Sequence, residues 1–267
     1  MTVRLETGSG RATITIDDPE RRNPLSTETM TDLLSFTEAA IGDPQVRVIV
    51  YTGAGDQAFS AGGDLSGSFA DDPIGLHQAR GRLADLFRAM QRGGKPTVAR
   101  VNGHALAGGF GLAVACDITI CVEDATLGVP EIGVGLWPMM ISTVLTRAMP
   151  RKAVLELMMT GRLLTPHEAM ALGAVSTVVP RGDLDVAVDE VCDKLASLSP
   201  SSLGLGRDSF YAMADTGFDT ALDRLQGGLT AITSTEDAAE GVAAFLAKRP
   251  PSWETTSAPP RAPLDGP

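Results

Sequence analysis

The stretch N-G-H-A-L-A-G-G-F-G at residues 102–111 decides the fold that we expect, because it sets a pair of glycines at the start of an apolar segment. Residues 110–115 continue as F-G-L-A-V-A, a composition typical of a buried helix. Gly108 would then open that helix, where backbone N–H groups have no partner inside the helix and the helix dipole is positive. The sequence therefore predicts that the Gly108 N–H stabilises an oxyanion.

A second glycine-bearing turn, F-S-A-G-G-D-L, lies at residues 59–65. Glycine suits a backbone that must approach a ligand closely, and Gly63 has no Cβ to obstruct an oxygen at its N–H. Two backbone N–H groups aimed at one carbonyl oxygen would stabilise an enolate. The two turns together predict an oxyanion hole.

An acid follows the second turn, in the segment L-G-V-P-E-I at residues 127–132. We expect apolar neighbours, namely Val129, Ile132, Val134 and Trp137, to surround Glu131 and raise its pKa toward that of a useful general base. The sequence thus predicts one catalytic carboxylate beside the oxyanion hole.

Strand and helix patterns alternate along the chain and predict an α/β core with crossover connections. Expected strands lie within 1–18 and at 46–52, 96–101, 118–122 and 175–179, and expected helices follow Ser26 and lie at 74–92, 166–172 and 184–199. After Pro200 only helical patterns remain, at 203–213, 220–233 and 236–248. We therefore expect a core domain over 1–199, a helical region over 200–254, and a disordered tail rich in Pro and Ala over 255–267.

Composition narrows the class of protein. The net charge of −11 disfavours nucleic acid and anionic membranes as partners, and no apolar run approaches membrane-spanning length. The three cysteines, Cys116, Cys121 and Cys192, lack paired spacing, which predicts buried reduced thiols and a cytoplasmic location. The histidines at 77, 104 and 167 lack ligand-like spacing, so we expect no metal site and only a structural role for His104.

One motif in the sequence is a decoy. Residues 53–58, G-A-G-D-Q-A, follow a strand and match the relaxed dinucleotide fingerprint G-x-G-x-x-A. That fingerprint needs a helix to open at the glycines, whereas residues 59–63 are expected to continue as a loop. We therefore expect no nicotinamide or flavin cofactor.

The three segments, in this order and with these separations, resemble the crotonase superfamily, which includes the enoyl-CoA hydratases and isomerases. The resemblance covers nearly the whole chain, including E-R-R-N-P-L at 20–25 and the ending at 241–249. It implies a spiral of ββα units and a C-terminal helical region that forms homotrimers, often paired into hexamers. It also implies an acyl-CoA substrate in fatty-acid or related metabolism, with CoA as part of the substrate and no further cofactor.

The resemblance assigns roles to individual residues. It implies that Gly63 and Gly108 donate to the thioester oxygen and that Glu131 is the acid/base. Substrate-binding residues would be Arg22, Ala61, Gly63, Asp64, Leu65, Gly108 and Trp137. Asp64 and Asp117 are similar to family aspartates that brace loops, and Trp137 with the pair Met139-Met140 is expected to line an acyl pocket or pack in the core.

The chain departs from the family pattern at Gly111, where the hydratases carry a second glutamate that helps to activate water. Met139 stands where the dienoyl isomerases and chlorobenzoyl-CoA dehalogenases carry an aspartate. One visible acid suffices for a 1,3-proton shift, so enoyl-CoA isomerisation or hydratase-like double-bond chemistry is the leading expectation. If Gly111 faces the substrate, Gly111→Glu should add hydration.

Two alternatives stay open at this point. The first is another single-acid activity of the superfamily, such as a carbon–carbon bond synthase or a thioester or diketone hydrolase. The second is a non-catalytic acyl-CoA-binding protein. Product analysis separates the first from an isomerase, and an inert Glu131→Gln variant would indicate the second.

Overall fold

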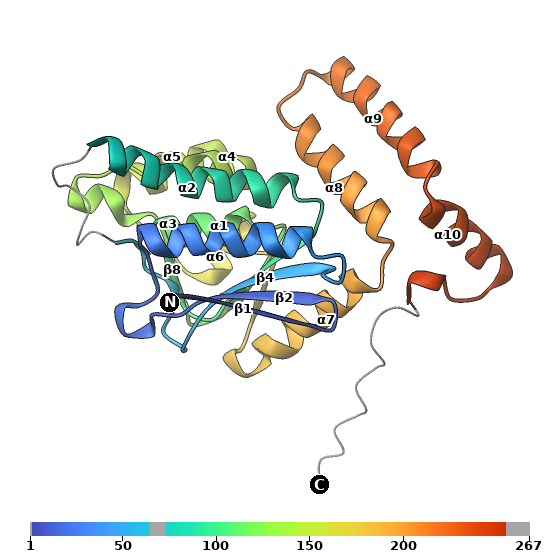
Figure 1. Cartoon of the computed structure of the whole chain (residues 1–267). Coiled ribbons are helices and arrows are strands. Elements are labelled where there is room, and N and C mark those ends of the chain that lie inside the picture. Colours follow the sequence, from blue (N-terminus) through green and yellow to red (C-terminus); the bar gives the residue numbers. More distant parts are fainter. Residues whose placement is uncertain (1, 65–72, 255–267) are drawn as a thin grey trace, which may run out of the picture.

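The computed structural model of the chain describes residues 2–64 and 73–254. Within them the largest sheet has six strands in the order β1-β2-β4-β7-β9-β12, with helices packed over it (Figure 1). The hairpin β1/β2 is antiparallel and the other four pairs are parallel, as crossover connections require. The strands are Val3–Gly8 (β1), Arg11–Ile16 (β2), Val48–Gly53 (β4), Thr97–Val101 (β7), Ile118–Val122 (β9) and Thr177–Val179 (β12).

Shorter strands build a second layer. They form a sheet in the order β11-β10-β8-β5 and a separate pair β3-β6. Each of β4, β7 and β9 leads into one of these short strands and then into a helix, so the chain winds as repeated ββα units, as expected. The short strands are Pro24–Leu25 (β3), Ala58–Ser60 (β5), Gly62–Gly63 (β6), His104–Leu106 (β8), Leu127–Gly128 (β10) and Leu163–Leu164 (β11).

Local sequence signals set the helix ends where the pattern predicts them. The Ser26 hydroxyl accepts from the Thr29 N–H and caps α1, and Thr165 with Glu168 forms the expected capping box before α6. The helices are Thr27–Gly42 (α1), Pro73–Arg92 (α2), Gly108–Ala115 (α3), Ser142–Ala148 (α4), Arg151–Thr160 (α5), Pro166–Ala171 (α6), Leu184–Ala196 (α7), Pro200–Met213 (α8), Phe218–Thr233 (α9) and Glu236–Ala247 (α10). The sequence patterns did not predict α4 and α5.

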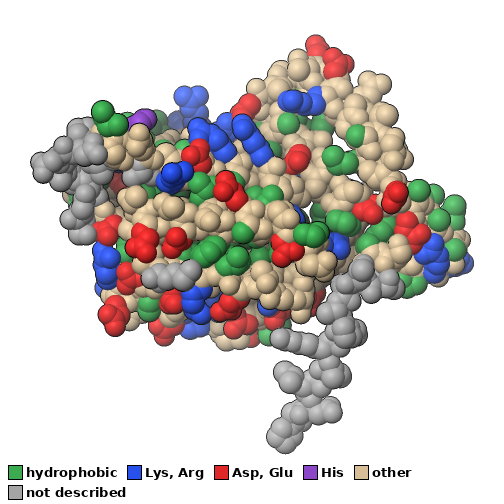
Figure 2. Space-filling model, in the orientation of Figure 1, with side chains coloured by type: hydrophobic (Ala, Val, Ile, Leu, Met, Phe, Trp, Pro, Cys, Tyr) green, Lys and Arg blue, Asp and Glu red, His purple; other side chains and the backbone are tan. Residues whose placement is uncertain are grey.

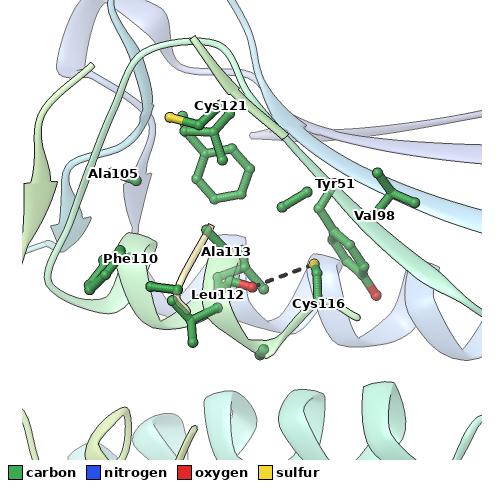
Figure 3. Close-up of a cluster of buried hydrophobic side chains, with 14 of the residues drawn as sticks. Tyr51, Val98, Ala105, Phe110, Leu112, Ala113, Cys116 and Cys121 are labelled. Atoms are coloured by element: carbon green, nitrogen blue, oxygen red, sulfur yellow. Dashed lines mark hydrogen bonds between the residues drawn. The ribbon is translucent and has the colours of Figure 1, made fainter. Parts of the chain in front are cut away.

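Helix α3 lies at the centre of the core and is buried from Gly109 to Ala115. Figure 3 shows its side chains beside Tyr51 and Val98 of the large sheet, in one continuous apolar cluster. The Cys116 thiol contacts the Leu112 carbonyl at 3.6 Å, and all three cysteines are buried and unpaired, as predicted. The helix that carries Gly108 is therefore held rigidly by packing on several sides.

Helices α8, α9 and α10 extend away from the sheet and its covering helices (Figure 1). No residue of α8 or α9 is buried, and Ala244 is the buried residue of α10. Figure 2 shows hydrophobic side chains gathered on the face over α10. The exposed large apolar residues of this region are Leu205, Phe210, Phe218, Leu222, Leu229, Val242, Phe245 and Leu246.

One polar cluster fastens α8 to the core. The Asp117 carboxylate accepts from the Thr97 backbone and hydroxyl at 2.7 and 2.9 Å. It also accepts from the Arg207 guanidinium at 2.8 Å and from the Tyr211 hydroxyl at 2.6 Å, and both of these residues lie on α8. The expected bracing role of Asp117 thus has a geometric basis.

The domain division at residues 199 and 200 stays a prediction, although α8 begins at Pro200. The predicted tail over 255–267 lies outside the described residues. No helix within 2–64 and 73–254 is long and apolar enough to cross a membrane.

Candidate active site

The two glycine turns lie against each other. Gly62 has a φ of +90°, and a Cβ built on it would lie 2.6 Å from the Ala107 Cβ and 3.2 Å from the Gly108 nitrogen. A Cβ built on Gly108 would in turn lie 3.9 Å from the Gly63 nitrogen. The structure therefore brings the Gly63 and Gly108 amides together, from chain segments that are far apart in sequence.

The strand pairing orients the Gly63 amide. β6 pairs in parallel with β3, and the Asp64 N–H donates to the Leu25 carbonyl at 3.4 Å. Because successive N–H groups of a strand point to opposite sides, the Gly63 N–H points away from β3. A Cβ on Gly63 would meet no protein atom within 4 Å, so packing demands glycine at Gly62 rather than at Gly63.

The second amide lies at the start of α3. The Ala107 N–H donates to the Gly128 carbonyl at 2.8 Å, and the Gly111 N–H makes an early helical bond to the Ala107 carbonyl at 3.0 Å. Gly108 belongs to the first turn, where N–H groups lack helical acceptors and the dipole is positive. This backbone end is suited to stabilising a negative oxygen.

Ser60 contacts both glycine turns. It is fully buried, and its hydroxyl accepts from the Gly62 N–H at 3.1 Å. A Cβ on Gly109 would lie 2.7 Å from the Ser60 Cβ, so only glycine lets β5 pack directly on α3. Residues 59–63 were expected to be a loop, and this was wrong, because β5 and β6 pair with other strands there.

Glu131 lies on a 3-10 turn, Pro130–Val134, rather than in an open loop. Its Oε2 atom is buried and has no hydrogen-bond partner among the described residues. Burial raises the pKa of this carboxyl above its ordinary value, opposed by a hydrogen bond from its own backbone. The Leu136 N–H donates to the Glu131 carbonyl at 3.0 Å and fixes the turn.

The apolar surroundings expected for Glu131 are correct only in part. Val129 is buried, but Ile132, Val134 and Trp137 are exposed in the single chain.

Strand register places Glu131 near the two amides. β8 and β10 are parallel, with Leu106 opposite Gly128. Chain segments that leave the carboxyl ends of neighbouring parallel strands emerge at the same edge of a sheet. Gly108 follows β8 by two residues and Glu131 follows β10 by three, so both lie at that edge.

The volume that a side chain at Gly111 would need is already occupied. A Cβ built on it would overlap the Cβ of Ile141 at 2.6 Å and also its Cγ2 atom. The expected gain of hydration in Gly111→Glu stays a prediction, and it would require Ile141 to move, because Ile141 occupies the volume that the new side chain needs. Ile141 is 3% exposed and was not identified from the sequence, since nothing local links it to a residue thirty positions earlier.

The other expected substrate-binding residues lie around the turns. The Arg22 carbonyl accepts from the Ala61 N–H at 2.9 Å, and Arg22 has a φ of +64°. Arg22 also lines a cavity of about 240 Å³ together with Asp56, His104, Asp124 and Arg181. Asp64 accepts from the Arg21 guanidinium at 2.6 Å.

The remaining expected site residues have mixed positions. Trp137 is 36% exposed and Met139 72% exposed, so Met139 does not pack in the core, whereas Met140 packs against it. Leu65 lies outside the described residues. His104 accepts from the Thr126 N–H through Nδ1 at 3.0 Å, which supplies a structural bond.

The loop that matches the dinucleotide fingerprint is filled by two asparagine side chains. The Asn23 amide donates to the carbonyls of Ala54 and Ala58 at 3.0 and 2.8 Å. The Asn102 amide donates to the Gly55 carbonyl at 2.8 Å. A strand rather than a helix follows these glycines, so the loop lacks the helix N-terminus that a pyrophosphate needs.

Among residues 2–64 and 73–254, no group of three His, Cys, Asp or Glu side chains is arranged to hold a metal ion.

Comparison with known proteins identifies the family. The family model for enoyl-CoA hydratase/isomerase matches residues 6–256, and the chain belongs to this family. A relative from Thermus thermophilus is 38% identical over 245 residues, which cover 91% of this chain and 96% of the relative. A carnitinyl-CoA dehydratase from Escherichia coli is 31% identical over 250 residues, covering 90% of this chain and 94% of the relative.

Solved structures agree with this assignment. An enoyl-CoA hydratase from Mycobacterium smegmatis has a TM-score of 0.90 at 30% identity and covers 95% of this chain and 99% of its own. The human enoyl coenzyme A hydratase domain-containing protein 3 also has a TM-score of 0.90, at 29% identity, with 95% and 100% covered. The protein is thus a crotonase-fold acyl-CoA enzyme of the enoyl-CoA hydratase/isomerase family.

Proposed function

We propose that this enzyme moves the double bond of an enoyl-CoA through a thioester enolate, with Glu131 as the acid/base. The observation that carries the proposal is the buried Oε2 of Glu131, which has no hydrogen-bond partner among the described residues and lies at the sheet edge that also bears Gly108. A buried carboxylate without a hydrogen-bond partner lowers the stability of the fold. Such groups are found at catalytic sites, where the carboxylate takes part in the reaction.

The two amides would stabilise the negative charge that forms during the reaction. The Gly63 and Gly108 N–H groups would donate to the thioester oxygen as negative charge develops on it. The turns are fixed by the Ser60 hydroxyl and by strand pairing, so the donors need little reorganisation when the charge forms. Each such donor is commonly worth about 10² to 10³ in rate.

Glu131 would supply the proton transfers. In a 3-enoyl-CoA it takes a proton from C2, the electron pair moves into the thioester to give a dienolate, and the same carboxyl returns a proton at C4. The double bond then lies between C2 and C3, and no redox change or cofactor enters. Burial raises the pKa of Glu131, which makes its carboxylate a stronger base once ionised.

Several residues would hold the substrate in this scheme. Ala61 and Asp64 lie on the first turn, and Trp137 follows the 3-10 turn that carries Glu131. We assign all three contacts with the acyl-CoA thioester. We also assign Arg22 a contact with CoA, because its backbone carbonyl accepts from the Ala61 N–H of the first turn at 2.9 Å and its cationic side chain suits phosphate groups.

Hydration or dehydration is the second candidate, favoured by the similarity to an enoyl-CoA hydratase from Mycobacterium smegmatis and to a carnitinyl-CoA dehydratase. The two reactions share the enolate and differ in whether water adds at C3. Gly111 offers no second carboxylate to orient that water, which favours the isomerase.

We also propose that the chain assembles as a homotrimer or a dimer of trimers. α8, α9 and α10 carry large exposed apolar side chains, among them Phe218 at 78% and Phe245 at 82% exposure. A surface of this kind is stable in water when a second copy covers it.

Product analysis tests the proposed activity. Purified protein is incubated with a 3-enoyl-CoA and, separately, with a 2-enoyl-CoA, and the products are resolved by chromatography. We expect conversion of the 3-enoyl to the 2-enoyl thioester, and a fall by about 10² or more in Glu131→Gln. Equal rates for wild type and a folded Glu131→Gln would remove Glu131 from the mechanism.

A further inference from the structure

Ile141 is packed onto the backbone of α3 at Gly111. The position of a Gly111 Cβ lies 2.6 Å from the Ile141 Cβ, so no gap the size of a methyl group separates the two. Ile141 is 3% exposed and immediately precedes α4, where its carbonyl accepts from the Leu145 N–H at 3.0 Å. A β-branched side chain in such a position has little rotamer freedom.

This contact lies one helical turn from the proposed oxyanion donor. Residues i and i+3 share a face of a helix, and Gly111 lies about 4.5 Å along the axis from Gly108. Ile141 therefore packs on α3 one helical turn beyond the proposed donor.

The surface that Ile141 presents there is aliphatic. The Gly111 N–H is already donated to the Ala107 carbonyl at 3.0 Å, so it is not free to hold a water. A water is retained at a buried point only when several polar groups bind it. Ile141 offers none, and Glu131 is the carboxyl that remains beside the substrate.

We infer that Ile141 determines which reaction the enolate site performs, by excluding water from the α3 side of the substrate. The inference rests on the proposed function. Hydration of a 2-enoyl-CoA breaks an O–H bond of water and forms a C3–O and a C2–H bond. Isomerisation breaks C2–H and forms C4–H through Glu131 without water. Ile141 blocks the first and leaves the second open.

The test compares the two reactions in the same variants. For each, kcat/KM is measured for hydration of a 2-enoyl-CoA and for isomerisation of a 3-enoyl-CoA. We expect Ile141→Ala to raise the ratio of hydration to isomerisation at least tenfold, and Ile141→Val to raise it by less. Leu33→Ala removes the same number of carbons from a fully buried site on α1 and should leave the ratio unchanged.

A double variant extends the test. Gly111→Glu combined with Ile141→Gly makes room for a carboxylate, and we expect a higher ratio than in Ile141→Ala or in Gly111→Glu alone. If Ile141→Ala does not fold, the test rests on whether Ile141→Val raises the ratio of hydration to isomerisation.

The outcomes separate this inference from the proposed function. An active isomerase whose ratio is unchanged in folded Ile141→Ala and Ile141→Val overturns the role of Ile141 alone. A wild type that hydrates as fast as it isomerises also overturns it. A wild type that acts on neither thioester overturns the proposed function, and the role of Ile141 with it.

Discussion

Replacing Gly62 by alanine should damage the site more than it damages the fold. A Cβ at this position would lie 2.6 Å from the Ala107 Cβ and 2.8 Å from the Leu106 carbonyl oxygen. Ordinary carbon contacts are about 3.5 to 4.0 Å, so relief requires a movement of about 1 Å. Both obstacles belong to the segment that leads into α3, so the movement separates Gly63 from Gly108.

The expected loss follows from that displacement. A misplacement of about 1 Å in a preorganised site can cost about 100-fold in rate, which is about 2.7 kcal/mol of transition-state stabilisation. The left-handed backbone adds about 1 to 2 kcal/mol of strain, which lowers the free energy of unfolding. Steady-state kcat/KM for isomerisation measures the first effect and urea unfolding the second.

Gly173→Ala is the matched control. Gly173 has a φ of +87°, close to the +90° of Gly62, and its Cβ would lie 2.7 Å from the Ala148 carbonyl oxygen. It follows α6, outside the two turns, so it should lose stability to a similar extent and keep its kcat/KM. If Gly62→Ala retained kcat/KM within about twofold of Gly173→Ala at equal stability, the two turns would not form the oxyanion site.

Three further predictions concern stability, pH and assembly. Burial raises the pKa of Glu131 above 4.5, so the native state binds this proton more tightly than the unfolded chain, and the stability so gained is lost as pH rises through the raised pKa. Glu131→Gln should therefore have a higher urea midpoint of unfolding than the wild type at neutral pH, but not below pH 4.5. The kcat/KM of the wild type should fall as pH drops through the raised pKa of Glu131. The same difference in urea midpoint between the two proteins at both pH values would refute this. Asp117→Asn leaves Arg207, whose side chain is 9% exposed, without its carboxylate partner. The free energy of unfolding in urea should fall by about 3 to 5 kcal/mol, and hydrogen exchange in α8 should increase. Asp215→Asn, in an exposed ion pair, should lower the free energy of unfolding by less than about 1 kcal/mol. Light scattering should give a multiple of the 27.8 kDa chain mass, reduced to that of the monomer by Phe245→Lys, and a monomeric wild type would contradict the proposed assembly.

Much of the fold could be predicted from local patterns. The alternation of apolar residues in β1 and β2, the Ser26 cap and the Thr165 capping box each act within a few residues, so the sequence displays them directly. The buried helix α3 was also evident, because its apolar composition is unbroken.

The elements that were missed depend on distant partners. β6 and β10 have two residues each and exist only because other strands pair with them. The Gly111–Ile141 contact joins α3 to the residue before α4, and no local pattern indicates it. Sequence reasoning thus identified Gly63, Gly108 and Glu131 as candidates, whereas the volume beside Gly111 could be judged only in three dimensions.

The most direct test of enolate formation by Glu131 is the exchange of substrate C2 hydrogen with D₂O, followed by mass spectrometry of a 3-enoyl-CoA and its product. We expect the wild type to incorporate deuterium at C2 and C4 to the extent that the proton on Glu131 exchanges with solvent before it returns, and Glu131→Gln to form product and incorporate deuterium slower by about 10² or more. Product formation and exchange that proceed equally fast in a folded Glu131→Gln would contradict the proposed mechanism.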